Sequence, residues 1–416
     1  MTQQDSIVGI DVGTTKVSVA VGQINEGMIQ VLALHSVANS GMRKGYVVDV
    51  EEVVSNISLA IEEVERMCGF TLTNCLTSIC SNQIVCVESK GVIATTRNDS
   101  EITEEDVIKA VEAAKTVALP PNYEIIHIVP KYFMVDGQNP IKEPVGLNGI
   151  RLEVSTCVVG TSTPPLRNLS KTLTMAGLEI EGIVFSPIAS AKCAINKKQK
   201  EQGVVMIDFG ASNTSIAVFI EGSLIHAKVF PIGSNHITND IAIGLKISIE
   251  AAEKIKITEG SALKDSARES EKINLSKYEE NEESTVSKKY VCEIIEARLN
   301  EIFSLIKEEL KSIEVEGLLP AGAVISGGGA KLNDLQTFAK SSLSLPVQIS
   351  RPSSELSGVI DKSDDPIYAG AIGLMLWGID EMNSIVSNKG KAINLDFGKF
   401  GGALDKVKGI FKNLLP

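Results

Sequence analysis

Residues 6–22 read SIVGIDVGTTKVSVAVG, and this stretch decides the fold of the chain. The apolar run 7–10 leads into a polar segment, DVGTT at 11–15, and alternating valines follow it. Alternation with a period of two residues is typical of a strand, so the stretch predicts a β-hairpin with the Asp-x-Gly segment at its tip. A third strand is expected over 28–38, and apolar residues at helical spacing predict a helix over 50–67.

The same order of elements returns later in the chain. Residues 203–207 form an apolar run, DFGASNT at 208–214 is a polar turn, and strands are expected over 215–220 and 224–230. A repeat of strand, turn, strand and strand predicts two similar halves that face each other.

Length, charge and composition exclude several classes of protein. A chain of 416 residues is too long for one ordinary core, which predicts two or more subdomains. The net charge of −12 repels phosphate backbones, so no nucleic acid partner is expected, and a membrane contact would need a local basic patch. The N-terminus lacks a signal-peptide pattern, and no apolar run reaches the roughly 18 residues that a bilayer span needs. The seven cysteines lack the spacing of a zinc site and are expected to be reduced.

Three polar segments have the chemistry of a nucleotide site. Turns of Gly, Ser and Thr suit phosphate groups, because the backbone can approach closely and the hydroxyls donate hydrogen bonds. The turn at 11–16 adds a lysine ammonium group, and the turn at 208–214 offers the same groups without the lysine. Asp11 and Asp208, at the base of the two hairpins, are candidates to hold magnesium through water, since this ion keeps several of its waters. The glycine triplet 327–329 follows an expected strand and would let an adenosine lie against bare backbone.

The hypothesis depends on the order of these segments, because a lone hairpin of this kind is usually only a tight turn. The order is a hairpin, a long gap, a matching hairpin, a second long gap, and a strand that ends in GGG. The chain has no G-x-x-x-x-G-K-[ST] segment, which excludes a P-loop protein. It also has no G-x-G-x-x-G segment that opens a helix, so a dinucleotide site is not expected.

This order of motifs resembles the superfamily of actin, sugar kinases and heat-shock chaperone ATPases. Within it, three longer stretches resemble the FtsA family: GMRKGYVVD at 41–49, the segment 127–153, and the segment 230–256. The resemblance covers nearly the whole chain. It implies an α/β, actin-like two-lobed ATPase fold with duplicated mixed-sheet subdomains. It also implies an inserted FtsA-type subdomain, which replaces the usual actin subdomain and lies on the other side of the molecule.

The resemblance further implies the subdomain limits, and the serines, asparagine and glycines within 384–401 favour a flexible linker there. The expected parts are subdomain 1A (1–82 and 163–200), the inserted subdomain 1C (83–162), subdomain 2A (201–247 and 316–383), subdomain 2B (248–315), a flexible linker (384–401) and a C-terminal amphipathic helix (402–416).

The site residues also follow from the resemblance, with ATP and magnesium as the implied cofactors. For Glu253 and Lys254, an exposed helical charge pair is the alternative interpretation. The candidate nucleotide-binding residues are Asp11, Gly13, Thr14, Thr15 and Lys16 in the first phosphate loop, Asp208, Gly210, Ala211, Asn213 and Thr214 in the second, Gly327, Gly328 and Gly329 in the adenosine loop, and Glu253 and Lys254 at the ribose or base.

The second phosphate loop departs from the family pattern, which is commonly richer in glycine. Ala211 and Ser212 stand where two glycines would, Asn213 stands where a threonine would, and Ser215 stands where an acid often sits. The added side chains would crowd the phosphates, and the lost acid would weaken the placement of a metal. ATP binding is therefore expected and fast hydrolysis is not, and no side chain is assigned as a catalytic base.

The last residues, 402–416, have the pattern of an amphipathic helix. On a wheel of roughly 100° per residue, the apolar residues fall within an arc of about 140°, and lysines occupy the opposite face. Lysines opposite an apolar face suit an anionic membrane surface, although a helix packed on its own domain is the alternative. The candidate membrane-binding residues are Leu404, Lys406, Val407, Lys408, Ile410, Phe411, Lys412, Leu414 and Leu415.

The leading hypothesis is thus a cytoskeletal recruitment protein of cell division. The resemblance implies that it binds ATP, self-associates into filaments, and holds the tubulin-like division protein FtsZ mainly through residues 248–315. It also implies recruitment of other division proteins, and a peripheral location on the cytoplasmic face of the cell membrane at the division site. The alternatives are a pilus-assembly scaffold, a sugar or acid kinase, and a chaperone ATPase of the same superfamily.

Overall fold

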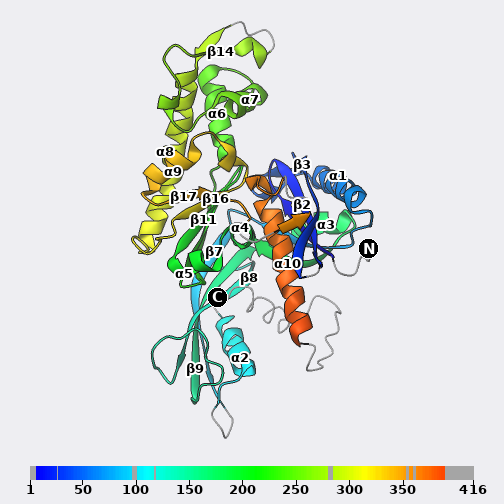
Figure 1. Ribbon diagram of the computed structural model, residues 1–416, viewed down its shortest axis with the longest axis vertical. Coiled ribbons are helices and arrows are strands. Elements are labelled where there is room, and N and C mark those ends of the chain that lie inside the picture. The colour runs from blue at the N-terminus through cyan, green and yellow to red at the C-terminus, as the bar shows by residue number, and fades with distance from the viewer. Residues whose placement is uncertain are drawn as a thin grey trace.

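Figure 1 shows the computed structural model of the chain, an elongated molecule with two sheets at its centre. The structure describes residues 6–25, 27–95, 101–116, 119–279, 284–352, 356–358 and 362–388. The predicted tail helix (402–416) lies outside these residues, as does the expected linker from 389 onward. Residues 384–388, expected to begin the linker, are instead the end of a helix.

The first sheet contains the hairpin that opens the chain. Strand β1 pairs with β2 antiparallel and with β6 parallel, and β2 continues antiparallel to β3. Alternate residues of β2 face opposite sides, so Val17 and Val19 pack under α1 while Ala20 packs under α10. The sheet order is β10-β6-β1-β2-β3-β18, with β1 (Ser6–Val12), β2 (Lys16–Asn25), β3 (Met28–Ala38), β6 (Asn74–Ile79), β10 (Glu179–Phe185) and β18 (Leu356–Gly358). A short ribbon of β4 (Met42–Arg43) and β5 (Tyr46–Val47) follows β3, and helices α1 (Val50–Cys68) and α3 (Thr163–Met175) cover one face.

The second sheet repeats the pairing of the first. Strand β11 pairs with β12 antiparallel and with β16 parallel, and β12 continues antiparallel to β13. The predicted duplication of a mixed sheet is therefore confirmed. The order is β13-β12-β11-β16-β17, with β11 (Val204–Phe209), β12 (Thr214–Ile220), β13 (Ser223–Phe230), β16 (Ala323–Ser326) and β17 (Val347–Ile349).

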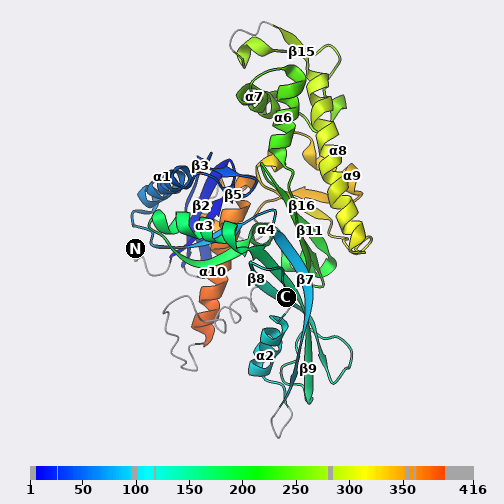
Figure 2. The ribbon, with the colours of Figure 1, turned by 180° about the vertical axis from the view of Figure 1, so that it is seen from behind.

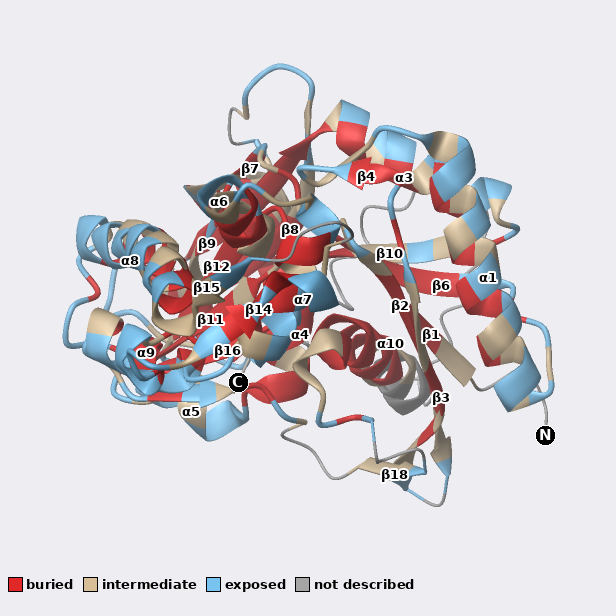
Figure 3. Cartoon of the chain, turned by 90° about the horizontal axis from the view of Figure 1, so that it is seen from above, coloured by how far each residue is buried: buried red, intermediate tan, exposed pale blue. Residues whose placement is uncertain are grey.

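Two helices, α4 (Ser186–Ala194) and α10 (Ala369–Asn388), pack together between the two sheets. Figure 3 shows both helices largely buried, with α10 beside the strands of the first sheet. Glycines permit this close packing: a Cβ atom on Gly373 would lie 1.8 Å from the Ala189 carbonyl oxygen, and one on Gly9 would lie 2.3 Å from that of Ala371. The halves are thus joined by a tight helix pair that cannot accept larger side chains at these points.

Each half carries a further block at one end of the molecule (Figures 1 and 2). The inserted sheet is antiparallel, in the order β7-β9-β8, and α2 covers one of its faces. Its elements are β7 (Ile84–Ala94), α2 (Glu104–Ala114), β8 (Tyr123–Val135) and β9 (Arg151–Ser162). At the other end, α6 (Ser234–Leu245), α7 (Ile249–Glu259) and α8 (Lys288–Ser312) pack together beside the small ribbon of β14 (Lys272–Asn274) and β15 (Thr285–Ser287).

The short elements complete the chain path. They are α5 (Lys197–Gln202), α9 (Leu335–Leu343) and the 3-10 turns η2 (Lys264–Ser266), η3 (Leu275–Lys277), η4 (Gly328–Lys331) and η5 (Pro366–Tyr368). In the part of the chain that the structure describes, no helix combines the length and the apolar character that a membrane crossing requires.

Candidate functional site

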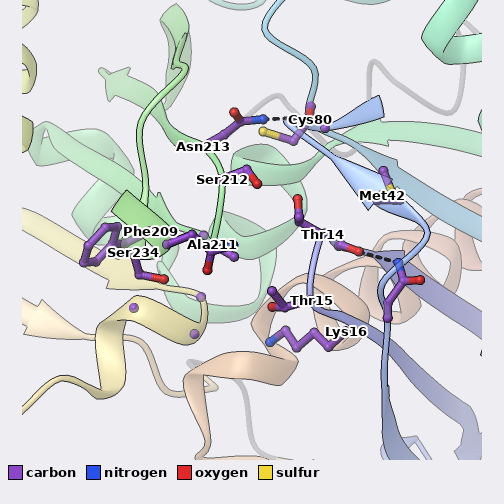
Figure 4. Close-up of a pocket in the computed structure, with 18 of the residues that line it drawn as sticks. Thr14, Thr15, Lys16, Met42, Cys80, Phe209, Ala211, Ser212, Asn213 and Ser234 are labelled. Atoms are coloured by element: carbon purple, nitrogen blue, oxygen red, sulfur yellow. Dashed lines mark hydrogen bonds between the residues drawn. The ribbon is translucent and has the colours of Figure 1, made fainter. Parts of the chain in front are cut away.

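A cavity of about 1380 Å³ lies between the two halves, and the turns of both hairpins contribute to its lining. Figure 4 shows Thr14, Thr15 and Lys16 of the first turn across the cavity from Ala211 and Ser212 of the second. The η4 turn, the first turn of α6, helix α7 and the start of α10 supply other walls. The volume exceeds the usual range of about 300–1,000 Å³ for ligand pockets, so a nucleotide-sized ligand fits.

The two hairpin turns have the same backbone structure. The Gly13 amide donates to the Lys16 carbonyl oxygen at 2.8 Å, and the Gly210 amide donates to the Asn213 carbonyl oxygen at 3.0 Å. In the strand register, Asp11 faces Ser18 in the first hairpin, as Asp208 faces Ser215 in the second. Asp11 and Asp208 are therefore equivalent, and so are Lys16 and Asn213.

Electrostatic interactions couple the two carboxylates and the lysine. Burial and the neighbouring Asp11 carboxylate raise the pKa of Asp208 to about 7, although Lys16 opposes this shift. Burial lowers the pKa of Lys16 to about 8 against the attraction of Asp11, Asp208 and Asp365. Two carboxylates that repel each other in a partly dry cavity favour the binding of a cation between them.

Contacts from distant segments hold the first turn in place. Ser78 Oγ donates to Asp11 Oδ1 at 2.5 Å, and Lys16 Nζ donates to the Ile367 carbonyl oxygen at 2.7 Å. Asn39 Nδ2 donates to the Gly13 carbonyl oxygen at 2.7 Å. A Cβ atom on Gly370, in the first turn of α10, would lie 2.9 Å from Asp11 Oδ2, so this helix start comes close to the carboxylate.

The start of α6 holds the second turn. The amides of Ser234 and Asn235 donate to the carbonyl oxygens of Gly210 at 2.9 Å and Ala211 at 2.8 Å. The side chains of Ala211 and Ser212 line the cavity, and the turn keeps the hydrogen bond from the Gly210 amide to the Asn213 carbonyl oxygen. Ser215 lies on the strand, only 1% exposed, where it accepts from Cys80 Sγ at 3.6 Å.

The glycine triplet after β16 forms another wall of the cavity. Gly327 has a φ of 87°, and a Cβ atom there would lie 2.6 Å from the Phe209 carbonyl oxygen. A Cβ atom on Gly329 would lie 2.5 Å from the ring of Phe209, whereas one on Gly328 would meet no atom within 4 Å. Gly327 and Gly329 thus pack against the second hairpin, and Gly328 leaves open space for a ligand.

Helix α7 brings four charged side chains to the cavity: Glu250, Glu253, Lys254 and Lys256. Glu253 pairs with Lys256 at 2.6 Å, while Lys254 is exposed at the rim. Lys256 is 7% exposed and donates to Thr238 Oγ1 at 2.8 Å, and burial lowers its pKa. Lys256 was missed by the sequence analysis, and its spacing of three residues from Glu253 on the same helix was the available signal.

The structure thus brings together at one cavity all of the candidate nucleotide-binding residues except Thr214. Thr214 is equivalent to Val17, is fully buried, and donates through Oγ1 to the Ile232 carbonyl oxygen at 2.7 Å. Ser78, Asn39 and Ser234 also line the cavity and were not expected. Among the described residues, no cluster of three or more His, Cys, Asp or Glu side chains is placed to ligate a metal directly.

Comparison with protein families gives two matches within the chain. Residues 205–373 match the family model described as "Cell division protein FtsA". Residues 81–160 match the model described as "SHS2 domain inserted in FTSA", which covers most of the inserted sheet and α2. The expected insertion in the first half is therefore confirmed.

Relatives from several bacteria cover most of the chain. A protein of Bacillus subtilis named "Cell division protein FtsA" is 35% identical over 375 residues, which are 90% of this chain and 84% of the relative. A protein of the same name from Pseudomonas aeruginosa is 32% identical over 382 residues, 92% of this chain and 91% of the relative. Their Escherichia coli counterpart is 29% identical over 385 residues, 91% of both chains.

Solved structures share the fold at lower identity. A chain of the "PilM-PilN type IV pilus biogenesis complex" superposes with a TM-score of 0.65 at 16% identity, over 90% of this chain and 98% of that chain. MreB5 of Spiroplasma citri bound to ADP superposes with a TM-score of 0.54 at 13% identity, over 93% of this chain and 100% of that chain. The predicted actin-like, two-lobed α/β fold is confirmed by these structures, which at such identities inform on fold alone.

Proposed function

The chain belongs to the family of the cell division protein FtsA, and from this premise we propose that it binds ATP with magnesium between its halves, polymerises, and tethers a division ring to the membrane. As a member of this family it is an actin-like cell division protein. The kinase and pilus-assembly alternatives are not favoured, because relatives that match about 90% of this chain at 29–35% identity are named as cell division proteins.

The equivalence of the two hairpin turns is the observation that carries the nucleotide proposal. Each turn places a carboxylate and backbone amides at the same cavity, and they do so from opposite halves. Phosphate groups held between such turns contact both halves at once. Lys16 is the cation of the first turn, and its lowered pKa of about 8 leaves it mostly charged at neutral pH.

Magnesium suits the pair of carboxylates. Asp208 has a pKa raised to about 7 by burial and by Asp11, and a dication near both groups would relieve that repulsion. Magnesium takes few carboxylates and keeps several waters, so two aspartates that act through water are enough. When bound, the ion would neutralise phosphate charge, and this chain's part is to hold and orient the phosphates.

We further propose that hydrolysis is slow. Asp11 and Asp208, the carboxylates of the two turns, are assigned to the metal, so neither is assigned as a catalytic base. The side chains of Ala211 and Ser212 line the cavity at the second turn, where glycines would leave more room for the phosphates. Nucleotide binding, rather than turnover, would then set the assembly state.

The block of α6, α7 and α8 is the proposed contact surface for FtsZ. Two large apolar side chains on these helices are exposed and do not line the nucleotide cavity: Ile243 by 76% and Tyr290 by 45%. Exposed apolar groups of this size support a protein-binding role for the block at 248–315 and its neighbour α6. The inserted subdomain is the proposed contact for neighbouring protomers and other division proteins.

The limits expected for the four subdomains fit this proposal, whereas the expected start of the linker at 384 does not, because α10 continues to Asn388. The two central sheets correspond to the expected subdomains 1A and 2A. The sheet of β7, β9 and β8 corresponds to 1C, and the block of α7 and α8 corresponds to 2B. The tail at 402–416 is proposed to anchor the filament to the cytoplasmic face of the membrane, since several short helices on one polymer bind far more tightly than one.

A titration with a fluorescent ATP analogue and magnesium tests the nucleotide site. Lys16→Ala is expected to weaken binding by about tenfold or more, because a charge-assisted contact with phosphate is lost. Thr214→Val is the matched control, because Thr214 points into the core and valine stands at the equivalent position 17. Equal affinity of Lys16→Ala and the parent would contradict the proposed site.

Co-sedimentation with anionic vesicles tests the tether, with and without ATP. The full chain is expected to pellet, and more so with ATP, whereas a chain that ends at Asn388 is expected to stay in the supernatant. Phe411→Glu is the point variant, since a charge on the apolar face opposes burial among the acyl chains. If Phe411→Glu pellets as well as the parent, the tail does not bind in the proposed way.

A further inference from the structure

Two cysteines of the inserted sheet lie side by side, at a place that the nucleotide site does not use. Cys86 on β7 faces Val159, and Cys157 on β9 faces Glu88, so the cysteines occupy diagonal positions on one face of the sheet. Their Sγ atoms are 2.9 Å apart. This separation is only about 0.9 Å longer than a disulfide bond, so the two sulfurs are within reach of each other.

The pair lines a cavity of about 290 Å³ at the junction between the inserted sheet and the second half. Strand β13 packs against β7 and β9 here, and Figure 2 shows β7 running up to the second sheet. Cys157 is only 1% exposed, whereas Cys86 is partly exposed and reaches the cavity. A small reagent can therefore meet Cys86 first, with Cys157 behind it.

Hydrogen bonds with Cys157 and His226 favour a thiolate at Cys86, in a cavity that Glu88 and Lys131 also line. His226 on β13 lines the same cavity, and its Nε2 lies 2.8 Å from Glu309 Oε1. The hydrogen bond with Cys157, together with that to His226, holds the pKa of Cys86 below its ordinary value despite burial. Cys157 keeps the shared proton, and its pKa is raised. Burial lowers the pKa of His226, but Cys86 and Glu309 outweigh it and raise that pKa overall.

The other five cysteines have pKa values above the ordinary value, in contrast to Cys86. Burial raises the pKa of Cys68 to about 11 and that of Cys75, Cys80 and Cys193 to about 12. Burial also raises the pKa of Cys292. A reagent that attacks thiolates should therefore discriminate Cys86 from the rest, because the thiolate is the reactive form.

We propose that Cys86 and Cys157 are a site of oxidative modification, at which a hydroperoxide converts the two thiols into a disulfide within the inserted sheet. Cys86 is the attacking residue and Cys157 is the resolving residue. His226 is a positioning residue, which keeps Cys86 charged.

The chemistry needs no group beyond the two thiols and the hydroperoxide. The Cys86 thiolate attacks the outer oxygen, the O–O bond breaks, and the leaving alkoxide takes a proton to become an alcohol. The product is a sulfenic acid at Cys86. The Cys157 sulfur then attacks the Cys86 sulfur, and the displaced hydroxide leaves as water with the Cys157 proton. Two thiols are oxidised by two electrons in total, and one hydroperoxide is reduced to an alcohol and water.

The disulfide would change how the inserted sheet packs against the second half. Diagonal positions in an antiparallel pair are about 7–8 Å apart at Cα, and a disulfide usually needs less than about 6.8 Å. Bond formation would therefore draw β7 and β9 together on the face that meets β13. It would also remove the thiolate beside His226, so oxidation acts directly on the junction between the two parts.

Thiol labelling of the full-length chain tests the first step. Brief treatment with iodoacetamide at neutral pH, followed by peptide mass spectrometry, gives the rate at each cysteine. Cys86 is expected to react at least about tenfold faster than Cys68, the matched control that is also partly exposed. His226→Gln is expected to slow Cys86 and leave Cys68 unchanged. Labelling of Cys86 no faster than Cys68 would overturn the proposal.

Peroxide treatment tests the second step. After oxidation, trypsin is expected to release the peptide 67–90 joined to the peptide 152–167, lighter by two hydrogen atoms than the two reduced peptides together. In Cys157→Ala, a dimedone adduct is expected at Cys86 instead of the link, and Cys292→Ala serves as the control that still forms it. Absence of the link in the parent chain, or a link through Cys68, Cys75 or Cys80, would refute the assignment.

Discussion

Replacing His127 by glutamine should remove a specific part of the pH dependence of stability. His127 lies on β8 with 2% of its surface exposed, and its Nε2 accepts from the Phe185 amide at 2.9 Å. Its ring stacks at a tilt on Trp377 of α10, with the centroids 5.7 Å apart. Burial lowers the pKa of His127 from 6.5 to about 4, so the folded protein holds this imidazole neutral.

The sign and the size follow from these two pKa values. Between pH 6.5 and about pH 4, His127 binds a proton in the unfolded chain but not in the folded chain. The free energy of unfolding therefore falls as the pH falls. The contribution of His127 to the free energy of unfolding is fully present above pH 6.5. The loss from this group is about 2 kcal/mol between about pH 7.5 and about pH 5. Glutamine can still accept from the Phe185 amide but does not titrate, so His127→Gln should lack this loss.

Urea unfolding followed by tryptophan fluorescence measures the effect locally, because Trp377 is the only tryptophan in the chain. The gap in unfolding free energy between parent and His127→Gln should shrink by about 2 kcal/mol as the pH falls from about 7.5 to about 5. Val129→Ala on the same strand is the control, since it removes buried volume without a titrating group and its cost should not vary with pH. An equal loss of stability in the parent and in His127→Gln would refute the reasoning.

Three further predictions concern packing and capping, and each is measured against the parent chain. Gly373→Val should destabilise the helix pair by about 3 kcal/mol or more in urea unfolding, because a Cβ atom would meet the Ala189 carbonyl oxygen at 1.8 Å; a smaller effect would contradict the close packing. Phe303→Ala should cost about 3–5 kcal/mol in the same assay, since its buried ring packs edge-on to Phe338 with centroids 5.5 Å apart; retention of full stability would refute this. Thr103→Ala should cost about 1 kcal/mol by removing the capping box of α2, seen as faster amide exchange in that helix and nowhere else.

The hairpin pattern was sufficient to predict the two halves, because strand periodicity and turn chemistry are local properties. Alternating valines at 17, 19 and 21 predict one return strand and the apolar run 216–220 predicts the other, and both hairpins formed as expected. The recurrence of the unit predicts that the halves are similar. It also predicts which turns correspond, including the equivalence of Asp11 and Asp208.

The site residues that could not be predicted from the sequence depend on contacts between segments that are distant in the chain. Lys256 reaches the cavity because α7 packs on α6, and no local pattern reports that packing. Asn39 and Ser78 hold the first turn from loops and strands elsewhere in the first half. Thr214 was wrongly included in the site, although the match of Asp208 with Asp11 makes it equivalent to the apolar Val17, which indicates a side chain that points into the core.

The C-terminal limit of the last helix shows how composition can mislead. Serine and asparagine between 384 and 388 favoured a linker, yet α10 continues to Asn388. Helix propensities of single polar residues differ by less than about 1 kcal/mol, so an established helix can extend through them.

The most direct test of the central claim is amide hydrogen exchange with and without saturating ATP and magnesium, read by mass spectrometry. If a nucleotide lies between the two equivalent turns, residues 11–16 and 208–213 should be protected together, along with the glycine triplet 327–329. Protection limited to one turn, or no change at either, would contradict a site shared by the two halves.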